Sequence, residues 1–255
     1  MSADATRDSS QASMVVLGAV GVLLMMGAWE LVGRLELLGR NWQPLSAVVR
    51  AFLENLPVFA RATRATIIDA GKGFVAGILL GLALAVLGLL APALNRGIGR
   101  MATLINSIPW IALGPVLVMI VSQETVPFTF ALLAVFFASF IAITSGFYLA
   151  RQSHHDLLSS LGSSRWTRFR RLQLPVAVPS LIYAAKLGAP AAMFGVVFGE
   201  WFGSSRPGLG ALIVTSMRSL RSDRLWAAAA LTSLIAIAVF AAFAALERAA
   251  LNRFR

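Results

Sequence analysis

The sequence predicts an all-α membrane protein that crosses the bilayer with about six helices. The 255 residues are 58% hydrophobic and only 13% charged, whereas soluble domains are about 45–50% apolar and about 25% charged. Arginines gather in the short segments between apolar runs, as expected for a polytopic protein. Four charge-free runs each exceed the ~20 residues that a helix needs to span the hydrocarbon core. These runs are 73–95, 101–123, 125–150 and 225–246.

Two more runs complete the six spans. Leu172–Gly199 is interrupted only by Lys186, and Met14–Trp29 is a shorter run that we expect to form a first helix up to Gly33. The segment before it, residues 1–13, carries one arginine and two aspartates, whereas a signal peptide begins with a basic region. We therefore expect a retained helix, with residues 1–13 as a disordered tail and 14–255 as one transmembrane domain.

The first long connection, residues 34–64, contains apolar residues at helical spacing after Pro44. This pattern predicts a short interfacial helix over Leu45–Leu56. The second spanning helix is predicted over 65–94. Its glycines recur every fourth residue, at 73, 77 and 81, a register that lets helices approach closely in lipid.

The rest of the chain alternates basic or polar connections with apolar helices. Residues 95–100 and 151–175 are expected to be basic loops, and 203–224 a polar connection. The remaining helices are predicted over 101–123, 127–150, 172–199 and 225–246.

Charge and motif content exclude several function classes. The net charge of +11 comes mostly from arginines at span boundaries, so membrane topology explains it better than nucleic-acid binding. The chain has no cysteine, which excludes disulfides and thiol catalysis. No phosphate-binding GxxxxGK[ST] loop, GxSxG or HExxH motif is present. His154 and His155 lack ligand spacing and are expected to be solvated. We therefore expect no cofactor and no metal in this chain, and any ATP that drives it must bind elsewhere.

Orientation follows from the arginines. Eleven lie on the side that holds both termini and the connections 95–100 and 151–175, against nine on the other side. The positive-inside rule assigns the first side to the cytoplasm. We expect a multi-pass protein of the bacterial inner membrane with both termini cytoplasmic.

The segment Asp156–Pro175, DLLSSLGSSRWTRFRRLQLP, carries the strongest functional pattern. Four of its arginines fall within seven residues, Gly162 permits a sharp turn, and Leu174-Pro175 is expected to end the segment. A helix, a glycine corner and a second short helix would project from the membrane and could dock on another protein. The alternative is an ordinary basic loop between two spans.

Three features are candidates for a translocation pathway. Pro109, Trp110 and Pro115 interrupt the third helix, and broken helices are tolerated where they line a cavity; a kink that only shapes packing is the alternative. Lys186 lies mid-span, where it could neutralise an anionic solute or pair with a carboxylate. Glu200-Trp201 opens a turn-rich stretch that we expect to cap the pathway.

Together these motifs resemble the inner-membrane permeases of ABC importers, in the subgroup for nitrate, taurine, alkanesulfonates and similar solutes. The family's coupling loop reads Glu-Ala-Ala, then Gly, then Leu-Pro; here Asp156-Leu157-Leu158 stands for Glu-Ala-Ala. Residues 107–115 and 199–210 resemble two further family elements, and the shared core would cover about 63–250. The residues that the resemblance places in ATPase coupling are Asp156, Leu157, Leu158, Gly162, Arg165, Leu172, Leu174 and Pro175.

The resemblance implies a type I ABC importer permease and its partners. These are a second permease, identical or paralogous, an ATPase dimer that holds ATP and Mg²⁺, and an extracytoplasmic binding protein that delivers a small anionic or polar organic solute. A stand-alone secondary transporter is the alternative function, and a membrane-embedded enzyme is a third, disfavoured by the missing catalytic set.

Overall fold

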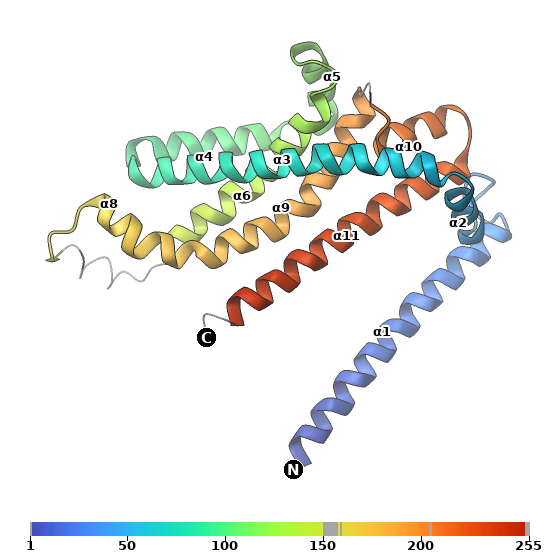
Figure 1. Ribbon diagram of the computed structural model, residues 1–255, viewed down its shortest axis with the longest axis horizontal. Coiled ribbons are helices and arrows are strands. Elements are labelled where there is room, and N and C mark those ends of the chain that lie inside the picture. The colour runs from blue at the N-terminus through green and yellow to red at the C-terminus, as the bar shows by residue number, and fades with distance from the viewer. Residues whose placement is uncertain (1, 150–157, 159, 204–205, 253–255) are drawn as a thin grey trace.

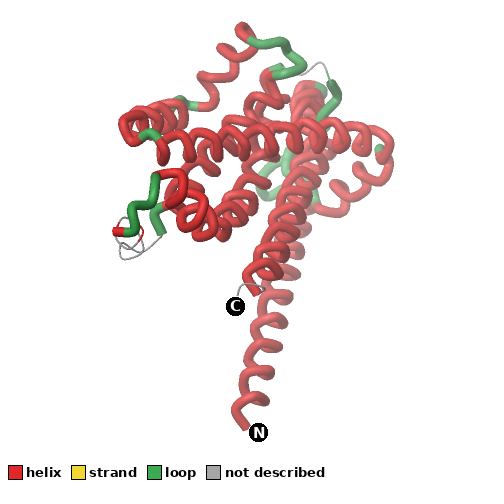
Figure 2. Tube along the Cα trace, turned by 60° about the vertical axis from the view of Figure 1, so that its left-hand side comes forward, coloured by secondary structure: helices red, strands yellow, loops and turns green. Residues whose placement is uncertain are grey.

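The computed structural model describes residues 2–149, 158, 160–203 and 206–252, and within these ranges every regular element is a helix (Figures 1 and 2). Figure 1 shows long helices lying side by side, with α1 standing apart from the bundle. The long helices are α1 (Ser2–Arg34), α3 (Leu56–Leu90), α6 (Val126–Phe147), α9 (Leu174–Phe202) and α11 (Ser222–Asn252). The shorter ones are α2 (Leu45–Glu54), α4 (Pro92–Ser107), α5 (Trp110–Ile120), α8 (Arg165–Arg168), a π-helix over Phe169–Gln173, and α10 (Leu209–Arg218).

Five of the described helices are long and apolar enough to cross a membrane, or six if one bent pair counts as a span. That pair is α4 and α5, which meet at an angle of 100°. The all-α, polytopic fold class is thus as predicted, and the interruption predicted in the third span is a break rather than the alternative, a kink. Pro109 explains the break, because a residue before proline is pushed out of the helical region and Ile108 is extended, with ψ of 124°.

Several predicted boundaries were wrong. Residues 95–100, expected as a loop, lie inside α4, because Pro92 ends α3 and starts a new helix at once. α3 begins nine residues earlier than expected, at Leu56 after the break at Asn55. The connection 203–224 contains the helix α10.

At the N-terminus, helix α1 starts at Ser2, although the sequence suggested a disordered tail over residues 1–13. The tail has neither glycine nor proline, so nothing in it breaks a helix that extends from the apolar run. By contrast, the short helix predicted after Pro44 is confirmed as α2, and its interfacial position stays a prediction.

The core lies where α6 packs between α3 and α9. Half of the α6 span is buried, more than in any other described span, and Phe130, Val135 and Ile143 are fully enclosed. The glycine register of α3 faces this helix: a Cβ at Gly77 would lie 2.7 Å from that of Val135, and one at Gly81 would lie 3.0 Å from a backbone nitrogen of α6. The glycines therefore set the close approach that the sequence predicted.

Helix α1 is tied to the bundle at one end. The rings of Trp29, Trp42 and Trp226 form a triad, with centroids 4.8–5.7 Å apart. Close by, Glu30 accepts hydrogen bonds from the backbone N–H and the hydroxyl of Ser46. Only 6% of the α1 span is buried, so the rest of this apolar helix is exposed.

Candidate functional site

The glycine corner of the predicted coupling loop has the geometry of a helix C-terminus. Gly162 has φ of +68°, the left-handed conformation that commonly ends helices. The Ser163 N–H donates to the carbonyl of Leu158 over 3.0 Å, which is the six-to-one bond of a Schellman motif. Asp156 and Leu157 lie outside the described residues.

A second helix starts immediately after the corner. The Ser164 hydroxyl accepts a hydrogen bond from the backbone N–H of Thr167 at 3.2 Å, the arrangement of an N-cap. From Trp166 to Phe202 the chain then forms one helical course. The glycine corner and the second short helix are therefore present over the described residues 160–168, whereas most of the predicted first helix lies outside the described residues.

The Leu174-Pro175 pair does not end the segment as expected. Pro175 is the second residue of α9, which continues directly from the π-helix. In that preceding turn the Leu174 N–H bonds the carbonyl of Phe169. A wider turn accommodates the proline ring, which would clash with a carbonyl in a regular α-helix. Leu172 and Leu174 are half-buried in this course, and Arg165 starts α8.

Phe169 anchors this loop in the core. It is 7% exposed, and its ring centroid lies 5.9 Å from Phe147 at the end of α6 and 5.4 Å from Trp166. Trp166 is 58% exposed and Leu161 is 73% exposed. The corner therefore presents apolar side chains outward, while the ring of Phe169 packs against the bundle. Through this ring a displacement of the loop would be transmitted to α6 and α9.

The broken third span brings Trp110 into an aromatic cluster. Its ring is stacked on Phe130 at 5.5 Å and meets Phe194 and Phe198 edge-on at 5.5 and 5.9 Å. Beyond Trp110, α5 leaves the bundle (Figure 1). Its contact with α9 uses Gly114, where a Cβ would overlap the ring of Phe202.

The two prolines around Trp110 are on the surface. Pro109 and Pro115 are exposed, and Pro115 lies inside α5. Trp110 itself is half-buried, so part of its ring packs against its neighbours and part remains accessible.

Lys186 has a carboxylate partner. Its Nζ lies 2.7 Å from Oε2 of Glu247 on α11, and these side chains are 19% and 17% exposed. The ammonium also lies over the rings of Tyr183 and Phe240. The sequence left two roles open for Lys186, contact with an anionic solute or pairing with a carboxylate. The structure shows the pairing with a carboxylate.

Glu200 is buried in the last turn of α9, whereas its neighbour Trp201 is 44% exposed. One carboxylate oxygen accepts a 2.7 Å hydrogen bond from the hydroxyl of Thr66 on α3, and the other accepts one of 2.6 Å from the N–H of Gly210. The sequence pointed to Glu200 but missed Thr66, whose only signal was a polar pair with Asp69 one turn apart in an apolar helix.

A polar hollow of about 540 Å³ opens at the end of the bundle opposite the glycine corner. Its walls come from the connection before α2, from α2, and from the turn between α10 and α11. The Arg221 guanidinium donates two hydrogen bonds to Asp223, at 3.2 and 3.1 Å, and this raises the pKa of Arg221 above its ordinary value. The charged residues of the hollow are Arg40, Arg50, Glu54, Arg221 and Asp223.

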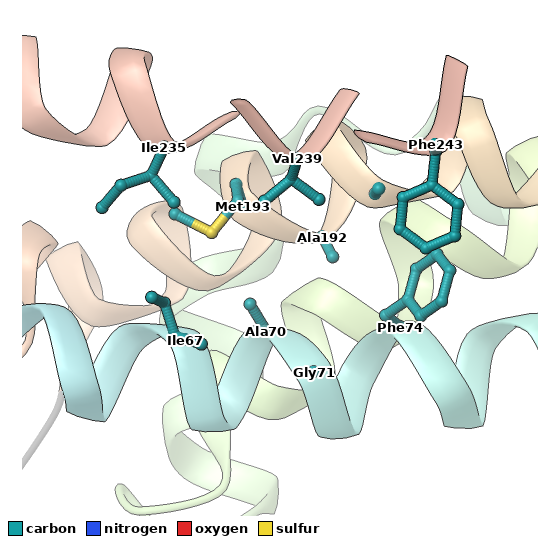
Figure 3. A pocket seen from close by; sticks show the side chains of 10 residues that line it. Ile67, Ala70, Gly71, Phe74, Ala192, Met193, Ile235, Val239 and Phe243 are labelled. Atoms are coloured by element: carbon teal, nitrogen blue, oxygen red, sulfur yellow. The ribbon is translucent and has the colours of Figure 1, made fainter. Parts of the chain in front are cut away.

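A second cavity, of about 190 Å³, lies between α3, α9 and α11 (Figure 3). Every side chain that lines it is apolar, and the rings of Phe74 and Phe243 close one end at 5.4 Å. With no hydrogen-bonding side chain in its wall, it cannot orient a polar solute. Among the described residues no group of acidic, histidine or cysteine side chains could hold a metal ion.

Comparison with known proteins agrees with this arrangement. Residues 73–252 match the family of binding-protein-dependent transport system inner membrane components. The chain is 26% identical over 233 residues to a formylaminopyrimidine transport permease protein of Halalkalibacterium halodurans, covering 88% of this chain and 90% of that protein. It is 26% identical over 211 residues to a probable ABC transporter permease protein of Haemophilus influenzae, covering 82% and 85%.

Solved structures share the fold. An inward-facing structure of the MetNI methionine ABC transporter matches with a TM-score of 0.65 at 16% identity, over 76% of this chain and 96% of the other. A bacterial ABC transporter that imports alginate matches with a TM-score of 0.56 at 16% identity, over 96% and 97%. The family match covers most of the chain, and the fold is that of type I importer permeases. The chain therefore belongs to the family of binding-protein-dependent transport system inner membrane components, the permease components of ABC importers.

Proposed function

We propose that this chain forms one half of a dimeric pathway that imports a small polar or anionic organic solute. A separate ATPase dimer, which binds ATP and Mg²⁺, docks at the glycine corner. A second permease, identical or paralogous, supplies the other half, and an extracytoplasmic protein delivers the solute. The protein then lies in the bacterial inner membrane, with both termini and the glycine corner on the cytoplasmic side.

The glycine corner is the observation that carries this proposal. It holds exposed apolar side chains on a turn with two defined ends, and Phe169 connects it to the core. When the ATPase closes on ATP, displacement of the corner would move α6 and α9. Because coupling between sites is reciprocal, a docked binding protein must favour ATPase closure as much as closure favours docking.

The charged hollow at the opposite end supports docking of the binding protein there. The hollow is lined by three arginines and two acidic residues. Nine arginines lie within residues 34–64 and 203–224, the two segments at this end. An acidic rim on the binding protein would complement this surface and speed its association.

The solute class rests on resemblance. The relative from H. halodurans is named for transport of a formylaminopyrimidine, a small polar heterocycle, and the motifs of this chain resemble permeases for nitrate, taurine and alkanesulfonates. We propose a solute of this size and polarity, and the ligand bound by the partner binding protein would identify it.

Co-purification followed by reconstitution tests the proposal. The neighbouring open reading frames are searched for an ATPase and a solute-binding protein. The chain is expressed with these candidates, purified through a tag on the chain, and placed in proteoliposomes. We expect the ATPase to co-purify and uptake to require ATP and the binding protein. Uptake by the chain alone, driven by an ion gradient, would instead favour the secondary transporter.

A further inference from the structure

The buried carboxylate of Glu200 belongs to a node that joins three helices. Thr66 of α3 is fully buried, and its hydroxyl donates to Glu200 while accepting a 2.8 Å hydrogen bond from the backbone N–H of Leu209. The second oxygen of Glu200 accepts from Gly210. Leu209 and Gly210 are the first two residues of α10, so the node satisfies two N–H groups that have no partner within their own helix.

α10 depends on this node for its N-terminal cap. Its N-cap residue is Gly208, which has no side chain to accept those N–H groups. A Cβ at Gly208 would overlap the Glu200 carboxylate, and one at Gly210 would overlap the carbonyl of Val197. The two glycines therefore let α10 start directly against the carboxyl group of Glu200, whose oxygen accepts the Gly210 N–H at the helix N-terminus.

The position of α10 matters at the end of the bundle opposite the glycine corner. A groove of about 290 Å³ lies between α10 and the start of α3, with Arg61 and Thr215 on its two walls. The residues that follow α10, Leu220 and Arg221, line the polar hollow. Any tilt of α10 would change both surfaces.

We propose that Glu200, acting with Thr66, is a positioning residue that fixes α10 and thereby shapes the surface on which the binding protein docks. This rests on the proposed function. Both carboxylate oxygens are already held by donors and the side chain is 4% exposed, so Glu200 does not face the solute. It acts on transport through the place it gives to α10.

The test uses the permease in complex with its ATPase, reconstituted with binding protein. Thr66→Val keeps the shape of the side chain but removes the hydroxyl, leaving buried polar groups of Glu200 and Leu209 without a partner. Thr66→Ser retains the hydroxyl. Thr232→Val is the matched control, because the Thr232 hydroxyl bonds only the carbonyl of Ala228 within its own helix.

Two readouts separate positioning from stability. Spin labels on cysteines introduced at Arg61 and Thr215 report the distance between α3 and α10, against a background free of native cysteine. Uptake is measured against binding-protein concentration and normalised to assembled complex. We expect Thr66→Val to broaden the distance distribution and to raise the half-saturating binding-protein concentration about tenfold, whereas Thr66→Ser and Thr232→Val change neither.

Other results decide against the proposal. An unchanged distance distribution in Thr66→Val, or uptake that falls only with the amount of complex, would overturn it. If Thr66→Val does not assemble, Glu200→Gln is measured in the same way, since it removes one acceptor and keeps the side-chain volume. The spin-label distance needs no transport, so a failure of the unmodified complex to take up solute would count against the proposed function alone.

Discussion

Substitution of Gly162 gives the sharpest test of the coupling corner, because its consequence follows from the backbone alone. Gly162 has φ of +68°, and no atom lies within 4 Å of the position that a Cβ would take. A Cβ there would therefore meet no steric contact among the described residues, and we take its cost to be that of the left-handed conformation. That cost is about 1–2 kcal/mol for an ordinary L-residue and up to about 3 kcal/mol for a strained backbone.

These energies predict a graded series. Gly162→Val should lower the population of the left-handed corner conformation by between about fivefold and about 140-fold, since 1.4 kcal/mol is a factor of ten. Gly162→Asn should cost much less, because asparagine tolerates the left-handed region. Gly162 itself is exposed, so both variants should reach the membrane in normal amounts.

The assay is the amount of ATPase that co-purifies with each variant, measured alongside ATP-driven uptake. We expect wild type and Gly162→Asn to retain the ATPase, and Gly162→Val to lose most of it together with uptake. Equal ATPase retention by the valine and asparagine variants would refute the reasoning, because the left-handed conformation would then not matter for docking.

Three further predictions concern topology, pathway and charge. Cysteines at Ser164 and Leu220 should label from opposite faces of the membrane, Ser164 only after permeabilisation; labelling of both from outside would remove a cytoplasmic corner. Trp110→Ala should lower the melting temperature, since loss of a packed tryptophan costs about 3–5 kcal/mol. Trp110→Phe should retain most of the stability. If Trp110 acts in the pathway, Trp110→Phe must still change uptake per folded molecule. Lys186→Met should destabilise the protein by leaving Glu247 unpaired, and adding Glu247→Leu should restore stability, since a paired apolar replacement is often neutral. Full uptake by the double variant would exclude a solute contact for Lys186, and a stable but inactive double variant would support one.

Local sequence patterns predicted the fold well at positions where a single residue determines the backbone conformation or the approach of two helices. Gly162 and the polar residues beside it indicated a corner, and the glycines of α3 indicated a close helix contact that α6 provides. The helix pattern after Pro44 placed α2 within two residues of its observed end. The all-α membrane class followed from the composition and the lengths of the apolar runs.

Other features depend on contacts between distant residues, which no local pattern contains. Lys186 and Glu247 are 61 positions apart, and Thr66 and Glu200 are 134 apart, so neither pairing could be read from spacing. Pro109 and Pro175 show a different limit. Proline predicts a disturbance of the helix, but the neighbouring packing decides between a 100° break and a π-turn.

The tryptophan triad has a consequence for the order in which the protein is assembled during synthesis. Trp29 and Trp42 are made early, whereas Trp226, which completes the triad, is made 184 residues after Trp42. At about 5–20 residues per second, that interval is roughly 10 to 40 seconds. Helix α1 would enter the membrane long before Trp226 exists, held by its contacts to α2 and to the connection before it, which includes Trp42. The first span to be inserted is therefore expected to be the last to dock, and until then the nascent chain leaves an apolar helix available to the insertion machinery.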